Sequence, residues 1–366
     1  MSPFPEECFD TSPSDGGGFY PALIHQKLDN EKYEIIRKLG YGRRSSTWLV
    51  VDASRGDLLA VKTFTVGASE RAKNIELRIS KAVARVDDAQ RVLRGFWQES
   101  KAGTHLCFVM PALGTSVERL ANEAEYHRLP IHTVQRIIYV ITRVLKTLHA
   151  SGIMHGAIKA DNIYFPANFD ASESKPTTVT VKKHTTVISQ PLSSRIKWNS
   201  KPKIVADWSI YVGNFGHAQK GAYEVERKND YSSAPETLLK DASCSPQTDI
   251  WMLGFLAYTL LIGNSPFASY GPSYRRIATM SASVGDDIPK TWFSDAKMKQ
   301  YNPDANDGSN VVSIEAGLAT VLRKKDAKEA AAFIKGCLRL DPQNRFTAKE
   351  CKEHEWLAHA GDCSCC

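Results

Sequence analysis

The pattern of apolar and polar residues changes about a third of the way along the chain. Before that point, short runs rich in β-branched residues predict four strands, over 33–39, 47–52, 58–64 and 106–110. One further stretch, 70–86, predicts a helix. We therefore expect the first part of the chain to form a small sheet with one helix.

Beyond Gly114 the pattern becomes helical. Apolar residues recur at spacings of four and three, at Val134, Ile138, Ile141, Leu145 and Leu148. This spacing predicts one apolar helix face turned toward a core. The longest apolar window, 250–263, has 14 residues, whereas a membrane-spanning helix needs roughly 20. It therefore predicts a buried core helix, and we expect no transmembrane segment.

Three segments differ in composition from the predicted sheet and helical regions. Residues 1–32 contain a run of three glycines and several prolines, which predicts a flexible N-terminal tail. Residues 166–203 are rich in Ser, Thr and Lys and predict an inserted surface loop, with a basic docking segment as the alternative. Residues 358–366 form a cysteine-rich tail, in which Cys363, Cys365 and Cys366 are expected to be plain thiols, with lipidation as the alternative.

Composition narrows the class of protein. The 366 residues suit one large domain or two lobes, and 42 % apolar with 24 % charged residues is ordinary for a folded chain. A net charge of +7 is too mild to indicate nucleic-acid binding, and none is expected. The other five cysteines are scattered, and the N-terminus lacks the features of a secretion signal. We expect a cytoplasmic or nuclear protein.

Several short motifs follow one another in a fixed order. Gly40 and Gly42 lie between two predicted strands and allow a tight turn over phosphates. Lys62 then stands in an otherwise apolar strand. The later motifs are His155-Gly-Ala-Ile-Lys-Ala-Asp-Asn162, Asn214-Phe-Gly216, Ala234-Pro-Glu236, Asp249-Ile-Trp251 and Asp341-Pro-Gln-Asn-Arg345. Each motif alone is weak, but their common order and spacing are specific.

These motifs resemble those of eukaryotic protein kinases over residues 33–357. Within that superfamily the chain resembles the SR-protein-kinase-like group, especially its fungal members, in LGYGRRSSTW, GTHLCFVMPALG and HGAIKADNIYF. The resemblance implies an α+β, bilobal fold. The expected lobes are a β-rich N-lobe over 33–112 and a larger helical C-lobe over 113–357, with a nucleotide cleft between them.

The resemblance also assigns nucleotide-binding roles. Gly40 and Gly42 would cover the ATP phosphates, and Lys62 would hold the α- and β-phosphates. Glu76 would pair with Lys62, with Glu70 as its rival. Ala60 would pack on adenine, and residues 110–113 would form the hinge.

Three further residues are assigned structural roles. Glu236 is expected to pair with Arg345, and Asp249 is expected to anchor the core helix. None of the three is expected to take part in chemistry.

The chain departs from the family pattern where the chemistry occurs. Ala157 stands where the family has the Asp that accepts the substrate proton, and Asn214 stands where it has the Asp that binds Mg²⁺. Lys159 is retained, and Asn162 is the only side chain retained from the metal pair. A different alignment would restore a metal-binding carboxylate at Asp207, within Val205-Ala-Asp207.

These losses predict a pseudokinase that acts on a protein partner as a nucleotide-binding scaffold or allosteric regulator. Its cofactor would be ATP or ADP, with Mg²⁺ of little importance. The alternatives are a weakly active serine/threonine kinase of the same group and an interaction domain that binds no nucleotide. The related kinases act on Arg-Ser-rich proteins through an acidic groove, but residues 264–330 hold eight acidic and nine basic residues, so the partner is not assigned.

Overall fold

The computed structural model of the chain describes residues 6–7, 17–168, 176–181, 184–226, 229–267, 271–301 and 311–360. The cysteines at 363, 365 and 366 and part of the 166–203 segment therefore lie outside the described residues. The chain divides into two units. Unit 1 comprises Met1–Thr115 and Tyr164–Arg195, and unit 2 comprises Ser116–Ile163 and Ile196–Cys366.

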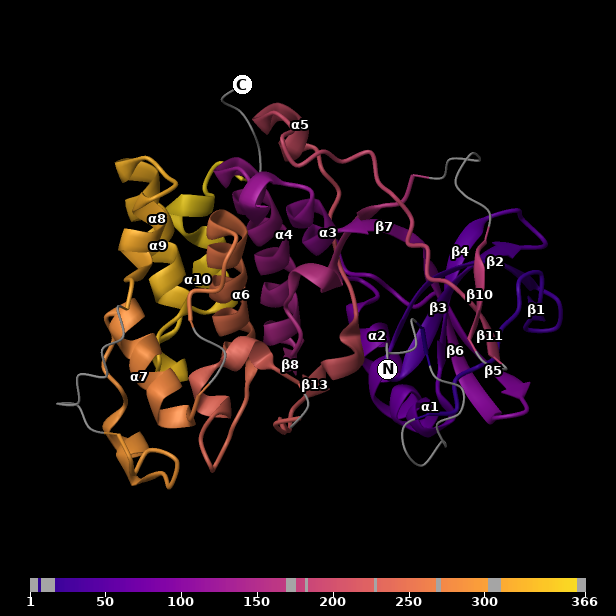
Figure 1. Cartoon of the computed structure of the whole chain (residues 1–366), viewed down its shortest axis with the longest axis horizontal. Coiled ribbons are helices and arrows are strands. Elements are labelled where there is room, and N and C mark those ends of the chain that lie inside the picture. The colour runs from indigo at the N-terminus through magenta and orange to yellow at the C-terminus, as the bar shows by residue number, and fades with distance from the viewer. Residues whose placement is uncertain are drawn as a thin grey trace. The chain divides into compact units, whose positions relative to one another are not determined.

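Unit 1 is built on a six-stranded antiparallel sheet, seen in indigo and purple in Figure 1. In spatial order its strands are β1 (Lys27–Leu28), β2 (Tyr33–Gly42), β3 (Ser45–Asp52), β4 (Leu58–Phe64), β6 (Gly103–Pro111) and β5 (Arg94–Ser100). The four strands predicted from the sequence correspond to β2, β3, β4 and β6. Strand β5 and the two-residue β1 were not predicted.

The two faces of this sheet are covered differently, because alternate residues of a strand point to opposite sides. On one face, Trp48, Val50 and Val61 join a buried cluster. On the other face, Phe64 and Phe108 pack against the helical segment. This segment consists of α1 (Val66–Arg71), the π-helix η2 (Ala72–Glu76) and α2 (Leu77–Val83). The expected helix over 70–86 is therefore interrupted by a π-turn.

Segments from both ends of unit 1 complete the first cluster. Tyr20 and Leu28, from the N-terminal 32 residues, are almost fully buried in it. Val187 joins them from a hairpin formed by β10 (Thr178–Val181) and β11 (His184–Val187), in which Val179 pairs with Thr186. The hairpin lies beside the sheet in Figure 1. Two short strands, β7 (Leu113–Ser116) and β9 (Ile163–Pro166), lie at the points where the chain passes between the two units.

Unit 2 is mainly helical. Its α-helices are α3 (Val117–Asn122), α4 (Ile131–Ala150), α5 (Pro202–Ala206), α6 (Pro246–Ile262), α7 (Ser273–Val284), α8 (Ile314–Ala319), α9 (Lys324–Cys337) and α10 (Ala348–Glu353). Its strands are β8 (Ile153–Met154), β12 (Tyr211–Val212) and β13 (Gln219–Lys220), and β8 pairs with β13. Its 3₁₀ turns are η3 (Glu125–His127), η4 (Ala160–Asn162), η5 (Phe215–His217), η6 (Tyr231–Ser233), η7 (Pro235–Thr237), η8 (Lys290–Ser294), η9 (Pro342–Asn344) and η10 (Glu355–Leu357).

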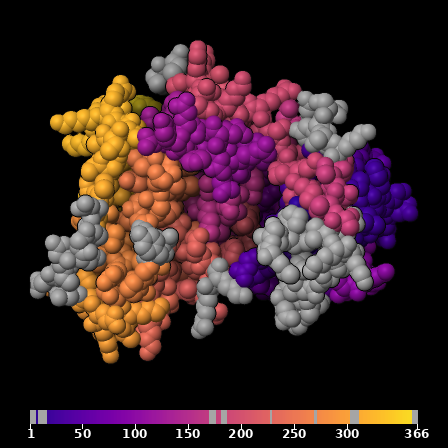
Figure 2. Space-filling model, in the orientation of Figure 1, coloured from indigo at the N-terminus to yellow at the C-terminus, as the bar shows by residue number. Residues whose placement is uncertain are grey.

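Helices α4 and α6 form the core of unit 2. The predicted apolar stripe of α4 is buried. Helix α6 is apolar on all sides and also buried, as its sequence predicted. Gly254 lets α9 approach α6 closely, because a Cβ at this position would lie 2.6 Å from the Cβ of Cys337. Helix α5, in contrast, lies at the surface (Figure 2) and exposes Ile204.

No described helix combines the length and apolar character needed to cross a membrane.

Candidate active site

In unit 1 the structure pairs Lys62 with Glu76. Lys62 lies on β4 and its Nζ is 3.0 Å from Oε2 of Glu76, which closes the π-turn η2. The rival residue, Glu70, instead lies 4.0 Å from Lys73 in an exposed pair. Of the two glutamates considered from the sequence, Glu76 is therefore the one that contacts Lys62. Its role toward a nucleotide remains a prediction.

The glycine-rich turn lies on the neighbouring strands. Gly40 pairs with Thr47 across β2 and β3, and Thr47 pairs in turn with Lys62 on β4. A Cβ added at Gly40 or Gly42 would meet no heavy atom within 4 Å. The turn therefore has open space beside it, which a ligand phosphate could approach.

Ala60 lies two residues before Lys62 on the same strand. It pairs with Met110 of β6, and both side chains are buried. Met110 begins the 110–113 segment expected to form the hinge. Unit 1 thus places Ala60, Met110 and Lys62 on the adjacent strands β4 and β6, and Glu76 contacts Lys62 from the helical segment.

In unit 2 the carboxylate of Asp249 holds the loop that follows β8. Asp249 lies near the N-terminal end of α6 and is fully buried. Its oxygens accept hydrogen bonds from the backbone N–H groups of His155, at 2.7 Å, and Gly156, at 2.8 Å. His149 of α4 lies 2.9 Å from the same carboxylate. Asp249 therefore anchors this loop as well as the core helix.

His155 is a buried packing residue. Its Nδ1 accepts the Ala157 backbone N–H at 3.2 Å, and its Nε2 lies 3.0 Å from the carbonyl of Gly213, to which it donates. The ring also packs against Phe215, with the ring centroids 5.0 Å apart. Burial lowers the pKa of His155, so the neutral ring that this hydrogen-bond pattern requires is favoured.

Ala157 is buried and offers only a methyl group at the position of the expected proton acceptor. Its backbone carbonyl accepts a hydrogen bond from the side-chain amide of Asn162 at 2.9 Å. The backbone at Ala157 is therefore held by a hydrogen bond from Asn162, although position 157 has no carboxylate.

Asn162 and Asn214 are bonded to each other. The amide of Asn214 donates to Oδ1 of Asn162 at 2.9 Å, and the backbone N–H of Gly213 donates to the Asn162 carbonyl at 2.8 Å. Asn214 adopts a left-handed conformation, with φ of 58°, which Asn tolerates better than most residues. Asp207, the alternative considered from the sequence, is exposed at the C-terminal end of α5.

The donor set fits a divalent cation poorly. Mg²⁺ favours carboxylate oxygens, and the side-chain oxygen of Asn162 already accepts a hydrogen bond from Asn214. Among the residues that the structure describes, no group of three or more His, Cys, Asp or Glu side chains could hold a metal ion.

Lys159 has a partner that the sequence analysis did not identify. Its Nζ lies 2.7 Å from Oδ2 of Asp230, and the pair is partly exposed. The other oxygen of Asp230 accepts the backbone N–H of Ser232. The two residues are 71 positions apart, and no motif marks Asp230, so the pairing could be found only from the fold.

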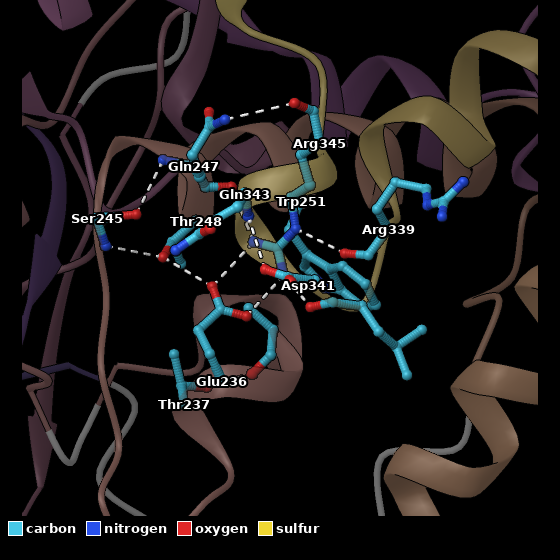
Figure 3. A network of polar contacts seen from close by, with 12 residues as sticks. Glu236, Thr237, Ser245, Gln247, Thr248, Trp251, Arg339, Asp341, Gln343 and Arg345 are labelled. Carbon is cyan, nitrogen blue, oxygen red and sulfur yellow. Dashed lines mark hydrogen bonds and ion pairs between the residues drawn. The ribbon is translucent and has the colours of Figure 1, made fainter. Parts of the chain in front are cut away.

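Glu236 and Arg345 form a buried ion pair in unit 2 (Figure 3). The guanidinium donates to both carboxylate oxygens, at 2.9 and 2.7 Å, and Thr248 also donates to Glu236 at 2.9 Å. Arg345 lies over the Trp251 ring, 5.0 Å from its centroid. The network joins η7, α6 and the segment after η9. The pairing expected from the sequence is present and is structural.

The arrangement of these elements is that of a protein kinase. The protein kinase domain family matches residues 33–357 of the chain, and the chain therefore belongs to this family. A crystal structure of a kinase domain superposes with a TM-score of 0.67, at 20 % identity, over 93 % of this chain and 99 % of that one. The expected α+β fold, with a β-rich N-lobe and a helical C-lobe, is confirmed.

Among curated proteins the chain resembles SR-protein kinases. It is 22 % identical to the serine/threonine-protein kinase SRPK of Physarum polycephalum, over 97 % of this chain and 92 % of that protein. A serine/threonine protein kinase of Aspergillus fumigatus is 24 % identical, over 94 % of this chain and 88 % of that protein. Mouse SRSF protein kinase 3 is 29 % identical over 43 % of this chain and 29 % of that protein.

Proposed function

We propose that this chain is a pseudokinase of the SR-protein-kinase-like group, which binds ATP or ADP and regulates a protein partner. The hydrogen bond between the side chains of Asn214 and Asn162 carries the proposal. In an active kinase the residues at these two positions hold Mg²⁺. Here the neutral amide of Asn214 donates to the side-chain oxygen of Asn162, and position 214 offers no carboxylate to a cation.

The expected loss of activity follows from the size of the missing contributions. A general base typically contributes about 10²–10⁴-fold to the rate, and Ala157 supplies none. Stabilisation of developing charge is commonly a larger contribution, and the neutral Asn214 weakens it by holding metal poorly. Because both losses fall on one site, we expect phosphoryl transfer to be very slow.

Nucleotide binding is better supported than catalysis. The Lys62–Glu76 pair is formed, and open space lies beside Gly40 and Gly42. An Asp at position 214 would repel the phosphates when no metal is present, whereas Asn214 is neutral. Lys62 and the glycine-rich turn would therefore hold the phosphates of ATP or ADP with little dependence on Mg²⁺.

A phosphate-transfer assay tests the loss of catalysis. The full chain would be incubated with labelled ATP, with Mg²⁺ or Mn²⁺, and with a generic basic protein and an Arg-Ser-rich peptide as substrates. We expect no transfer above that of the Lys62→Ala variant. A rate within tenfold of an ordinary protein kinase, lost in Lys62→Ala, would overturn the proposal.

A weakly active serine/threonine kinase is the second candidate, and Asp230 is the observation that favours it. Its carboxylate lies 2.7 Å from Nζ of Lys159, a lysine of the catalytic-loop motif only two residues from Ala157. Asp230 could accept the substrate proton in place of the missing Asp. In that case Asp230→Asn would abolish a slow wild-type activity, while the exposed Asp241→Asn control would retain it.

A further inference from the structure

A buried lysine in unit 1 binds two carboxylates from the start of the chain. Lys38 lies on β2, and its side chain is 0 % exposed. Its Nζ is 2.7 Å from Oε2 of Glu6 and also donates to Oε2 of Glu7. Both glutamates are themselves buried. The contact joins residues more than thirty positions apart in the sequence.

A second segment of unit 1 completes the surroundings of Glu6. The backbone N–H of Ser189 donates to Oε1 of Glu6 at 2.6 Å, and its hydroxyl donates to Oε2 at 2.8 Å. Gln190, next to Ser189, donates its backbone N–H to the carbonyl of Lys38 at 2.8 Å. An ammonium, an amide and a hydroxyl from two separate segments therefore converge on one carboxylate.

The surroundings of Lys38 make a counter-charge necessary. Its Nζ lies 5.1 Å from the ring centroid of Tyr41 and 5.6 Å from that of Trp48. A buried cation left without an anion is strongly destabilising, and the aromatic rings alone would offset only a small part of that cost. Lys38 therefore favours an occupant that carries a carboxylate.

The present occupant fills the site incompletely. Oε1 of Glu7 is buried without a hydrogen-bond partner among the described residues. An unsatisfied buried oxygen costs stability. The contact is therefore not optimal, and a segment with a better placed second acidic group could compete for it.

We propose that Lys38 and Ser189 form a binding site for acidic peptide segments, which Glu6 and Glu7 fill within the chain and an acidic segment of a partner protein can enter in their place. The ligand is recognised through its carboxylates. The site lies beside Tyr41 of the glycine-rich turn. None of the contacts that form it involves Lys62, Ala157 or Asn214.

A peptide-binding experiment on the full chain tests this site. Glu6→Lys with Glu7→Lys places positive charge beside Lys38 and should expel the chain's own segment. A fluorescein-labelled peptide of residues 1–16 should then bind this double variant with micromolar affinity, measured by anisotropy. Wild type should bind the peptide at least tenfold more weakly, because its own segment competes.

Three controls define the result. Glu31→Lys with Glu34→Lys changes the charge equally at exposed positions and should bind as weakly as wild type. Adding Lys38→Met to the Glu6→Lys, Glu7→Lys variant should weaken binding at least tenfold, as should replacing both glutamates of the peptide by Gln. Absence of binding to the double variant, or binding that survives Lys38→Met or the Gln peptide, would overturn the proposal.

Hydrogen exchange provides a second test that does not depend on the charge-reversed variant folding. The amide of Ser189 donates directly to Glu6, so Glu6→Gln should accelerate its exchange at least tenfold relative to wild type. Excess peptide of residues 1–16 should slow it again. An unchanged exchange rate in Glu6→Gln would contradict the proposed site.

Discussion

The side-chain amide of Asn214 donates to the side-chain oxygen of Asn162 across 2.9 Å, and the amide of Asn162 donates to the carbonyl of Ala157 across 2.9 Å. The chain of bonds connects three positions at which an active kinase has its proton acceptor and metal ligands. Every link is between neutral groups. The carboxylate that anchors this loop is that of Asp249, which accepts from the backbone N–H groups of His155 and Gly156 and is not one of these three positions.

Metal-independent nucleotide binding is the first expected outcome. ATP or ADP should bind in the micromolar to millimolar range, with an affinity that changes little when excess EDTA is added, because Asn214 does not repel phosphate. Lys62→Ala should weaken binding. Titration calorimetry with and without Mg²⁺ measures both effects. Binding that disappears in EDTA would point to a carboxylate at the metal position, and absence of binding under both conditions would leave an interaction domain that holds no nucleotide.

Restoring the carboxylates should restore activity. Ala157→Asp with Asn214→Asp supplies a proton acceptor and a metal ligand to a loop still held by Asp249. We expect phosphate transfer clearly above wild type, and each single variant should show less. Lys159→Ala in the double-Asp background is the control that should lose the gain. An inactive double variant that still binds nucleotide would show that other parts of the site have also changed.

The buried ion pair of unit 2 should contribute strongly to stability. Arg345→Ala leaves Glu236 buried without its counter-charge, and the loss in unfolding free energy should be about 3–5 kcal/mol. The matched control is Arg323→Ala, whose side chain is 90 % exposed beside Asp326 and should cost about 0–1 kcal/mol. Urea denaturation measures both. Equal losses of unfolding free energy in the two variants would contradict the prediction that the buried ion pair contributes more to stability than the exposed one.

Stability should fall as the pH decreases below about 6.5. Burial lowers the pKa of His155, His105 and His354 from the ordinary value of 6.5. Below that value the unfolded chain takes up protons that these folded, neutral rings do not, so the unfolding free energy decreases by up to about 1.4 kcal/mol per pH unit for each such proton.

Urea denaturation at pH 7.5 and 5.5 measures this dependence. His155→Gln should reduce it, whereas His25→Gln, at an exposed position, should not. An unfolding free energy that is higher at pH 5.5 than at pH 7.5 would contradict the predicted direction of the pH dependence.

The sequence predicted the parts of the fold that local pattern determines. Strands β2, β3, β4 and β6 and helices α4 and α6 have strong periodicity or long apolar runs, and all were identified. Strand β5 was missed because Phe96 is its only buried residue and it contains no β-branched residue. Tyr20 and Leu28 lie in a segment whose composition is typical of a tail, yet both are buried through contacts that composition does not record.

The candidate site was predictable only where a motif exists. Lys62, Ala157, Asn162 and Asn214 could be placed by motif order. The partners of these residues depend on the folded chain. Asp230 contacts Lys159 from 71 positions away, and Lys38 contacts Glu6 from 32 positions away. Such pairs leave no periodic signal in the sequence.

The π-turn that ends at Glu76 has a mechanical consequence for the Lys62–Glu76 pair. A π-turn uses i→i+5 hydrogen bonds where an α-helix uses i→i+4. Conversion of residues 72–76 to regular α-helix would shift the register by one residue and rotate the two flanking helices relative to each other by about 100°. Glu76 would then turn away from Lys62 without any movement of the sheet. A partner that binds this helix could thus make or break the Lys62–Glu76 ion pair by converting a single helical turn between the π and α forms.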